Sequence, residues 1–290
     1  MAAIELKGVS FTYATATAPT ITDLSFSVRE GELCALVGAN GSGKTTVCNI
    51  VRGFIPRFHT GEISGSVLIN GEDISDTNLG LLGLQIGFVF QNPFVQISGS
   101  KDTVYEEVAF GLENLGVDVA TIHERVEETL DLINIQHLRD KNPVDLSGGQ
   151  KQRVAFASTI AMDPPIFVID EPTSQLDPQG TNEIFEIISL LKSRGKSIIL
   201  VEHKMELIAE YADSVIVLND GHLVMEGTSA EIFSSPDLAQ YGVAYPEFAR
   251  AALALREAGV ALDHIPVTRE DSVRTLSAAR HTRSQKEAGR

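Results

Sequence analysis

A run of nine residues near position 40 combines glycine, lysine and threonine in an order that can hold phosphate groups. The run consists of Gly38, Ala39, Asn40, Gly41, Ser42, Gly43, Lys44, Thr45 and Thr46. Its glycines allow a tight loop whose backbone N–H groups point at phosphate oxygens. Lys44 is expected to reach the β- and γ-phosphates of a nucleoside triphosphate, and the Thr45 hydroxyl is expected to bind Mg²⁺. The run therefore predicts a nucleotide site.

Two acidic residues end an apolar strand further along the chain. Residues 166–169 read Ile-Phe-Val-Ile, and Asp170 and Glu171 follow them. Asp170 could hold the metal ion, directly or through water, and Glu171 could polarise the water that attacks the γ-phosphate. Acidic residues at a strand end are common by themselves, but a phosphate-binding loop upstream favours the catalytic interpretation.

A serine and two glycines offer a second phosphate-binding surface. The segment consists of Leu146, Ser147, Gly148, Gly149 and Gln150, and a predicted helix follows it. Free N–H groups at such a helix start can bind an anion. One domain does not need two of these surfaces for one nucleotide, whereas a head-to-tail dimer does, because each chain can close on its partner's nucleotide. A capped helix start without a ligand is the alternative for this segment in isolation.

The order of predicted elements brings these segments onto one sheet. The predicted strands lie at 4–13, 24–28, 33–37, 67–69, 87–90, 166–169, 197–201 and 215–218. Apolar residues with helical spacing follow the phosphate-binding loop and also extend through 178–191. Strands that alternate with helices predict an α/β fold with a parallel sheet covered by helices. A helical insertion at about 92–162 interrupts the alternation.

Composition excludes several classes of protein. The chain has 290 residues, 43% of them hydrophobic, which is ordinary for a folded protein. It carries 39 acidic and 23 basic residues, a formal charge of −16, so nucleic acid is not expected as a partner. The two cysteines cannot form a disulfide framework and fit a reducing compartment. Residues 77–100 lack charge but contain polar groups, and they are predicted as a buried strand between loops rather than a membrane span.

The chain resembles the nucleotide-binding domain of ABC ATPases over about residues 3–235, and its segment 146–150 reads LSGGQ, like the signature of that family. The resemblance implies that Tyr13 stacks on adenine, although a core aromatic is the alternative. It implies that Gln91 senses Mg²⁺ and links two subdomains, and that His203 contacts the γ-phosphate. Residues 174–177 would cross a dimer interface.

The resemblance also implies how the whole site is composed. The catalytic residues would be Lys44, Glu171 and His203. The Mg²⁺ ligands would be Thr45, Gln91 and Asp170. ATP and Mg²⁺ would be the cofactors, and Ser147, Gly148, Gly149 and Gln150 would contact the nucleotide of a second subunit.

The implied domain organisation has two parts. Residues 1–235 would form an ABC-type nucleotide-binding domain with a RecA-like core, an antiparallel β subdomain and a helical subdomain at about 92–162. Residues 236–290 would form a C-terminal extension with a dimer-supporting helix. The basic stretch from Arg274 to Arg290 is predicted to be a flexible tail.

Segments 88–115, 171–181 and 201–221 are similar to the energy-coupling factor branch of ABC importers. One departure is Phe94, where an acidic or polar residue is expected; it is interpreted as a core aromatic or as an interface anchor. This similarity implies an ATPase motor at the cytoplasmic face of the membrane that powers import of a vitamin or a transition-metal ion.

Partners follow from the same resemblance. They would be a second ATPase subunit, identical or paralogous, an integral membrane subunit and a small membrane subunit that binds the substrate. Two alternatives remain at this point: the motor of a conventional importer with a soluble binding protein, and a non-transport ABC ATPase that acts on a soluble complex. Substrate choice lies in other subunits, so the sequence does not assign it.

Overall fold

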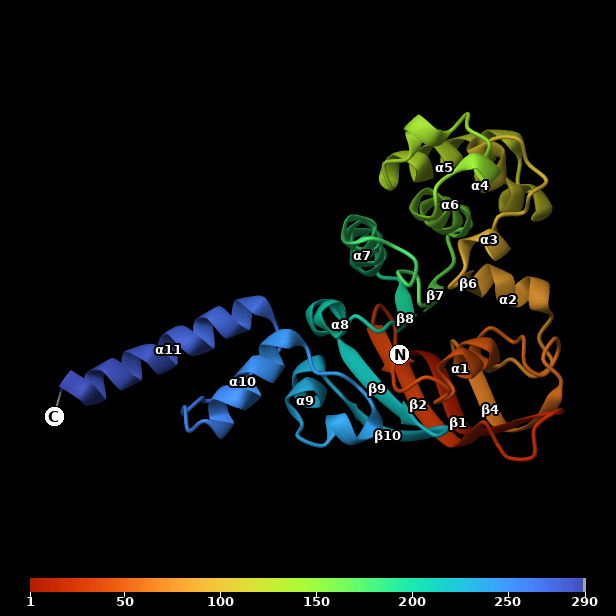
Figure 1. Ribbon diagram of the computed structural model, residues 1–290. Coiled ribbons are helices and arrows are strands. Elements are labelled where there is room, and N and C mark those ends of the chain that lie inside the picture. The colour runs from red at the N-terminus through yellow and green to blue at the C-terminus, as the bar shows by residue number, and fades with distance from the viewer. Residues whose placement is uncertain (289–290) are drawn as a thin grey trace.

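The computed structural model describes the backbone of residues 1–288 and the side chains of residues 1–278. A six-stranded sheet forms its centre, in the order β10-β9-β3-β8-β7-β6 (Figure 1). The strands are β3 (Leu33–Val37), β6 (Ile86–Val89), β7 (Ile166–Asp170), β8 (Ser197–Val201), β9 (Ser214–Asn219) and β10 (His222–Gly227). All neighbours pair in parallel except β9 and β10. The carboxyl ends of β3, β7 and β8 therefore meet at one edge.

A second, antiparallel sheet packs beside the first, in the order β2-β1-β4-β5. Its strands are β1 (Ala2–Tyr13), β2 (Ile21–Arg29), β4 (Gly61–Ile69) and β5 (Glu72–Asp73). Strand β2 alternates buried and more exposed residues, because one face of this sheet is covered and the other is not. Helix α1 (Lys44–Val51) contributes buried side chains to the core beneath the covered face.

Strand β3 separates the two hydrophobic cores of the molecule. Cys34 and Leu36 belong to the core shared with α1 and the antiparallel sheet. Leu33, Ala35 and Val37 belong to the core on the other side. That side is covered by α7 (Pro178–Ser193), α8 (Met205–Tyr211) and α9 (Ser229–Ser234). All five residues of β3 are buried, which explains their continuous apolar run.

Helices between β6 and β7 form a separate layer, at the top of Figure 1. They are α3 (Pro93–Gln96), α4 (Val104–Asn114), α5 (Val119–Leu132), the 3₁₀ helices η1 (Gln136–Leu138) and η2 (Pro143–Asp145), and α6 (Gly148–Ala161). Helix α4 starts with a capping box between Thr103 and Glu106. Its buried residues Val104, Val108 and Leu112 pack into the core with α5 and α6.

The C-terminal part consists of the 3₁₀ helix η3 (Leu238–Tyr241), α10 (Glu247–Glu257) and α11 (Arg269–Ala288). Helices α10 and α11 project away from the sheets (Figure 1). Residues from Arg274 onward were predicted to be a flexible tail; the structure gives them helical backbone through Ala288, and their flexibility stays a prediction. The Thr268 hydroxyl accepts a hydrogen bond from the Asp271 N–H at 3.3 Å, and this N-cap starts the helix. Residues 289–290 lie outside the described chain.

The α/β class with an antiparallel subdomain and a helical subdomain is confirmed. The prediction of strand and loops alone for residues 77–100 is wrong, because α2 (Leu79–Gln85) and α3 flank β6. The Asn78 side chain accepts a hydrogen bond from the Gly80 N–H at 2.7 Å and caps α2. Among the helices of the described chain, none combines the length and apolar character needed to cross a membrane.

Candidate functional site

The phosphate-binding loop connects β3 to α1 and has a backbone that requires glycine. Gly38 has φ +152°, and a Cβ there would lie 2.2 Å from the Leu218 carbonyl oxygen. Gly43 has φ +104°, and a Cβ there would lie 2.6 Å from Cδ1 of Ile21. Between them, Ala39, Asn40, Gly41 and Ser42 form the turn. The Ser42 Oγ is buried and has no hydrogen-bond partner, so it is free for a ligand.

Lys44 begins α1 and folds back over this loop. Its Nζ donates hydrogen bonds to the carbonyl oxygens of Gly38 at 2.9 Å and Ala39 at 3.0 Å. Burial lowers the pKa of Lys44, while the carboxylates of Glu171 and Asp170 act in the opposite direction. The ammonium group therefore lies among the loop carbonyls and two acidic side chains, where a phosphate would be bound.

Asp170 ends β7 and faces the start of α1. It is 5% exposed, and its Oδ1 is buried without a hydrogen-bond partner. Burial raises the pKa of Asp170, while a hydrogen bond with the neighbouring Thr45 hydroxyl opposes this rise. An ionisable oxygen without a partner, beside a hydroxyl group, is a donor pair that suits a hard divalent cation.

Glu171 connects three elements. Gln91, just after β6, donates a hydrogen bond from Nε2 to Glu171 Oε2 at 2.6 Å. His203, just after β8, has its Nε2 3.0 Å from Glu171 Oε1. Glu171 has φ +47°, an uncommon backbone conformation for a residue with a side chain, and its N–H donates to the Val201 carbonyl at 2.9 Å. The structure thus brings together Gln91, Glu171 and His203, which are up to 112 residues apart in the sequence.

Glu202 fixes the backbone beside His203, and sequence reasoning missed it. It is 3% exposed, and its Oε1 accepts hydrogen bonds from the N–H groups of His203 at 2.8 Å and Lys204 at 3.3 Å. Its Oε2 accepts a hydrogen bond from the Thr173 hydroxyl at 2.7 Å. An acidic residue directly after a buried strand and directly before a histidine was the available signal.

Tyr13 lies at the end of β1, next to α1. Its hydroxyl is 3.1 Å from Oγ1 of Thr46, and its ring packs edge-on against Phe11 with centroids 4.7 Å apart. The side chain is only partly buried, so part of the ring is open to a ligand. Stacking on adenine stays a prediction.

The signature segment occupies a different surface. Ser147 caps α6, and a capping box joins it to Gln150. The first residues of α6, Gly148 and Gly149 among them, line a cavity of about 450 Å³ together with residues 175–177. Two of the predicted segments, 146–150 and 174–177, therefore lie together. No residue of the phosphate-binding loop lines that cavity. Such a separation is what a site completed by a second subunit would require.

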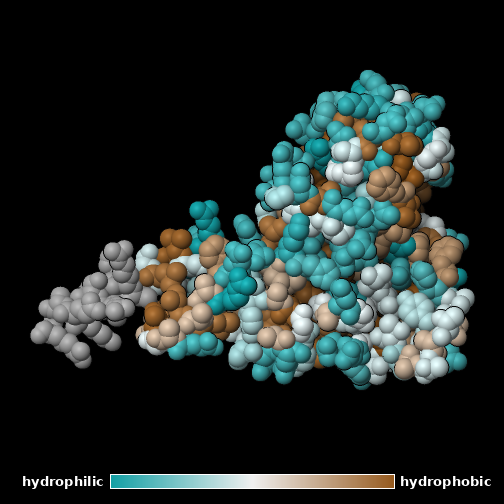
Figure 2. All heavy atoms as spheres, in the orientation of Figure 1, coloured by the Kyte–Doolittle hydropathy of each residue, from teal (hydrophilic) through white to brown (hydrophobic). Residues whose placement is uncertain are grey.

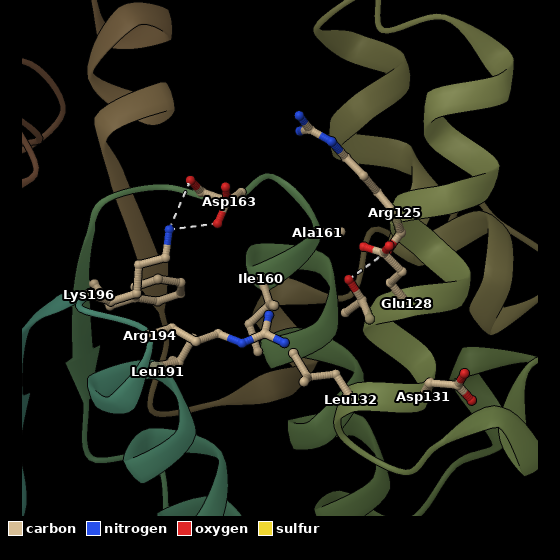
Figure 3. A pocket seen from close by; sticks show the side chains of 12 residues that line it. Arg125, Glu128, Asp131, Leu132, Ile160, Ala161, Asp163, Leu191, Arg194 and Lys196 are labelled. Carbon is tan, nitrogen blue, oxygen red and sulfur yellow. Dashed lines mark hydrogen bonds and ion pairs between the residues drawn. The ribbon is translucent and has the colours of Figure 1, made fainter.

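A larger cavity of about 610 Å³ lies between α5, α6 and the end of α7, away from all these residues. Its lining includes Arg125, Arg194 and Lys196 (Figure 3). Lys196 already pairs with Asp163, with Nζ 2.6 Å from Oδ1. The cavity contains none of the predicted site residues.

The residues present fit ATP with Mg²⁺. The loop supplies backbone N–H groups and the unpartnered Ser42 hydroxyl, while Asp170 supplies an unpartnered oxygen beside Thr45. Within the described residues there is no cluster of three or more histidine, cysteine or acidic side chains that could hold a metal alone. A Mg²⁺ ion here would take most of its ligands from phosphates and water, as it does in other nucleotide sites.

Known proteins are similar to this chain over most of its length. A model of the ABC transporter family matches residues 21–174. The energy-coupling factor transporter ATP-binding protein EcfA2 of Caldanaerobacter subterraneus subsp. tengcongensis is 38% identical over 93% of this chain and 94% of its own. The structure of cbiO1 from Clostridium perfringens, part of the ABC transporter complex cbiONQ, has a TM-score of 0.74 at 29% identity, covering 89% and 97% of the two chains.

A solved dimer is also similar. The ATP-binding cassette MJ0796, in a post-hydrolysis state bound to ADP and Pi, has a TM-score of 0.69 at 27% identity, covering 78% of this chain and 98% of its own. The resemblance to ABC ATPases and to their energy-coupling factor branch is confirmed by these similarities. The chain belongs to the ABC transporter family and is an ATP-binding and ATP-hydrolysing subunit of a transporter.

Proposed function

We propose that this subunit powers an importer of the energy-coupling factor type, for a vitamin or a transition-metal ion. The observation that carries the proposal is similarity to an EcfA2 subunit over 94% of that protein's length, which includes the region after the nucleotide-binding domain. Similarity to cbiO1, part of the complex cbiONQ, supports it. We further propose residues 1–235 as the ATPase domain and 236–290 as the extension.

In the proposed mechanism, Lys44 and the loop N–H groups hold the β- and γ-phosphates, and Tyr13 contacts the adenine. Glu171 orients the attacking water, and His203 stabilises the charge that develops on the γ-phosphate. Thr45, Asp170 and Gln91 would hold Mg²⁺, which neutralises charge on the phosphate oxygens when bound. Because Gln91 and His203 both contact Glu171, their positions determine where its carboxylate can accept a proton.

The proposed active unit is a head-to-tail dimer. Each chain's Ser147–Gln150 segment would close on the γ-phosphate bound by the other chain, because the two surfaces lie apart within one chain. The dimeric MJ0796 cassette supports this arrangement. The C-terminal extension would add contact area, because Val273 and Leu276 of α11 are 63% and 39% exposed. Figure 2 shows hydrophobic residues on the part of the molecule next to the grey atoms.

The helical layer would contact the membrane subunit at the cytoplasmic face. Phe94 is 57% exposed, so the interpretation as a core aromatic is wrong and the interpretation as an interface anchor stands as the proposal. Lys151 Nζ lies 4.3 Å from the Phe94 ring centroid and would leave the outer face of the ring free. Aromatic side chains of this kind are enriched at interfaces.

Capture of partners from detergent-extracted membranes tests the proposal. The tagged full chain is expected to recover a multi-span membrane protein, a small hydrophobic membrane protein and a second ATPase subunit. A conventional importer would yield no small membrane protein, and a non-transport ATPase would yield no membrane protein at all. Phe94→Asp is expected to reduce recovery. The matched control is Val119→Asp, because Val119 is also exposed on the helical layer, at 71%.

A further inference from the structure

Glu202 joins two segments at the edge where the carboxyl ends of β7 and β8 meet. It is buried, and its Oε1 accepts hydrogen bonds from the backbone N–H groups of His203 at 2.8 Å and Lys204 at 3.3 Å. Its Oε2 accepts a hydrogen bond from the Thr173 hydroxyl at 2.7 Å. Thr173 is 1% exposed, so both members of this last contact are shielded from water. One carboxylate therefore holds the segment after β7 against the segment after β8.

The two strands stop pairing just before Glu202. Their last backbone hydrogen bond runs from the Glu171 N–H to the Val201 carbonyl at 2.9 Å. Two side-chain contacts then join residues 171–173 to residues 202–203: Glu171 with His203, and Thr173 with Glu202. The His203 side chain is 43% exposed, whereas the second contact is buried. Water competes less for a buried hydrogen bond, so the contact between Thr173 and Glu202 is the more constant of the two.

The backbone at Glu171 needs support of this kind. Its φ of +47° is uncommon for a residue with a side chain, and such conformations persist only where the surroundings fix them. The Glu171 N–H is held by β8, and the Glu171 carbonyl accepts a hydrogen bond from the Ser174 N–H at 3.3 Å. Thr173 lies inside that turn and is held by Glu202. Glu202 thus fixes the backbone on either side of the 3.0 Å contact between Glu171 Oε1 and His203 Nε2.

A purely structural role is the alternative, because α8 begins just after Glu202. Lys204 is the N-cap of α8, and its own side chain makes no capping hydrogen bond. The Glu202 carboxylate supplies a partner for the Lys204 N–H instead. That role does not require Thr173, which belongs to the other segment. The contact with Thr173 is therefore the observation that separates a role in the site from a role in starting the helix.

We propose that Glu202 is a positioning residue for ATP hydrolysis, which sets the separation of Glu171 and His203 through its hydrogen bond with Thr173. Glu202 itself would contact neither the nucleotide nor the attacking water, because its oxygens are already occupied by three donors. A misplacement of about 1 Å between groups that act on one reacting atom can lower a rate about 10²-fold. The inference rests on the proposed catalytic roles of Glu171 and His203.

The test compares Thr173→Val with Thr173→Ser in the full chain together with its captured partners. Valine has a similar volume but lacks the hydroxyl, whereas serine keeps it. Turnover is counted per site that binds N-methylanthraniloyl-ATP, so that unfolded protein does not lower the value. Thr173→Val is expected to lower kcat about 10- to 100-fold with little change in KM for ATP, and Thr173→Ser is expected to stay within about threefold of wild type.

Thr129→Val is the matched control, because Thr129 is also buried and its hydroxyl donates a hydrogen bond to the Arg125 carbonyl at 2.7 Å, within α5. It should keep the wild-type kcat per binding site. An unchanged kcat for Thr173→Val would overturn the inference, and so would a loss that Thr173→Ser shares in full. Either result would leave Glu202 with the structural role alone.

Variants of His203 and Glu171 separate this inference from the proposed roles on which it rests. In a His203→Ala background, Thr173→Val should lower kcat further by less than about threefold, because the separation that it disturbs no longer matters. A full further loss would show that Thr173 acts independently of His203 and would overturn the inference. If His203→Ala and Glu171→Gln both lower kcat while Thr173→Val does not, the inference fails alone. If neither lowers kcat, the proposed catalytic roles fail, and the inference with them.

Discussion

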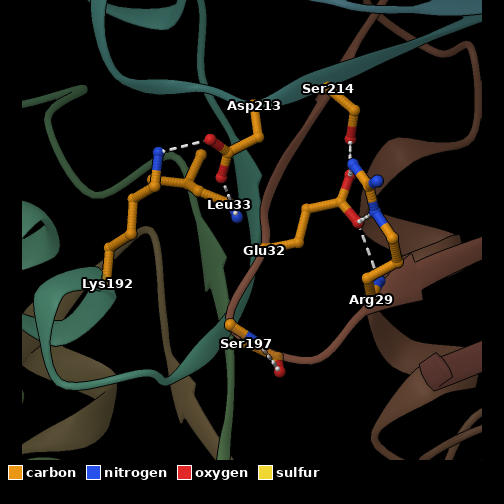
Figure 4. Close-up of polar contacts among 8 residues, drawn as sticks. Arg29, Glu32, Leu33, Lys192, Ser197, Asp213 and Ser214 are labelled. Atoms are coloured by element: carbon orange, nitrogen blue, oxygen red, sulfur yellow. Dashed lines mark hydrogen bonds and ion pairs between the residues drawn. The ribbon is translucent and has the colours of Figure 1, made fainter. Parts of the chain in front are cut away.

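The two ends of the parallel sheet treat polar groups in opposite ways. At the amino end, Glu32 accepts hydrogen bonds from the Arg29 backbone N–H at 2.8 Å and Nε at 2.9 Å, and from the Ser214 hydroxyl (Figure 4). Asp213 accepts from the Leu33 N–H at 2.9 Å and from Lys192 Nζ at 2.7 Å. Each of these charged groups has a partner within the chain.

At the carboxyl end, Glu202 is also hydrogen-bonded, but two other groups lack partners. Ser42 Oγ and Asp170 Oδ1 are buried without hydrogen bonds, and Glu171 adopts φ +47°. Such groups cost stability in the free protein, and they persist where a ligand needs them. One end of the sheet therefore stabilises the fold, whereas the other holds unpartnered polar groups for a ligand at the expense of stability.

The largest effect is expected for a substitution at the carboxyl end that lowers the rate of ATP hydrolysis and leaves the fold intact. Glu171→Gln is expected to lower the rate of ATP hydrolysis by about 10²–10⁴-fold, because the amide cannot take the proton of the attacking water. Size-exclusion chromatography should then show an ATP-bound dimer that persists. Glu32→Gln at the amino end is the control and should leave the rate unchanged. A normal rate for Glu171→Gln would refute the role assigned to it.

At the amino end, a substitution should act on stability. Glu32→Ala is expected to lower the free energy of unfolding by about 2–3 kcal/mol, since Arg29 and Ser214 lose a charged acceptor. Urea denaturation measures this, and a loss below about 0.5 kcal/mol would contradict the comparison.

The stability due to Glu32 should depend on pH. Burial alone would raise the pKa of Glu32, but hydrogen bonds from Arg29 and Ser214 outweigh burial and hold it below its ordinary value of 4.5. The stabilisation is therefore fully present above pH 4.5 and is lost as pH falls through the lowered pKa of the folded state. The difference in unfolding free energy between wild type and Glu32→Ala should shrink in that range.

The contribution of Asp170 to the free energy of unfolding should change with pH in the opposite direction to that of Glu32. Burial raises its pKa above the ordinary 3.8, so the ionised carboxylate destabilises the nucleotide-free fold. This penalty appears as pH rises from 3.8 through the raised pKa, and it is complete at higher pH. Asp170→Asn is expected to raise the free energy of unfolding by about 1–2 kcal/mol at pH 7, with the gain vanishing below pH 3.8. A loss of stability at pH 7 would show that the two ends do not differ.

The smallest effect is expected for Lys192→Met. Lys192 and Asp213 pair at 2.7 Å, but their side chains are 31% and 38% exposed. Exposed ion pairs contribute little, so unfolding free energy should fall by about 0.5 kcal/mol or less. A fall of about 2 kcal/mol in the free energy of unfolding would mean that the exposed pair of Lys192 and Asp213 stabilises the sheet as strongly as the buried Glu32 does.

Local signals in the sequence predicted much of the fold. Strand β3 was predicted with its observed bounds, because a fully buried strand between polar residues reads as an uninterrupted apolar run. Helix α2 was missed, because its leucines and glycines carry no polar face and only Leu82 is buried. The helical form of residues 269–288 was missed because a charged stretch without an apolar stripe reads as a solvated tail.

The motifs predicted which residues gather at the site but not how they contact one another. The hydrogen bond from Gln91 to Glu171 joins residues 80 positions apart, and only the pairing of β6 with β7 brings them together. Glu202 was adjacent to a predicted residue, but its burial could not be read from the sequence.

The double engagement of the Glu171 carboxylate limits where a water molecule can be held. Gln91 donates to one of its oxygens and His203 lies at hydrogen-bonding distance from the other, while each oxygen keeps a second lone pair. An incoming water molecule must therefore approach on the side that neither neighbour occupies, and a shift of either neighbour would redirect it.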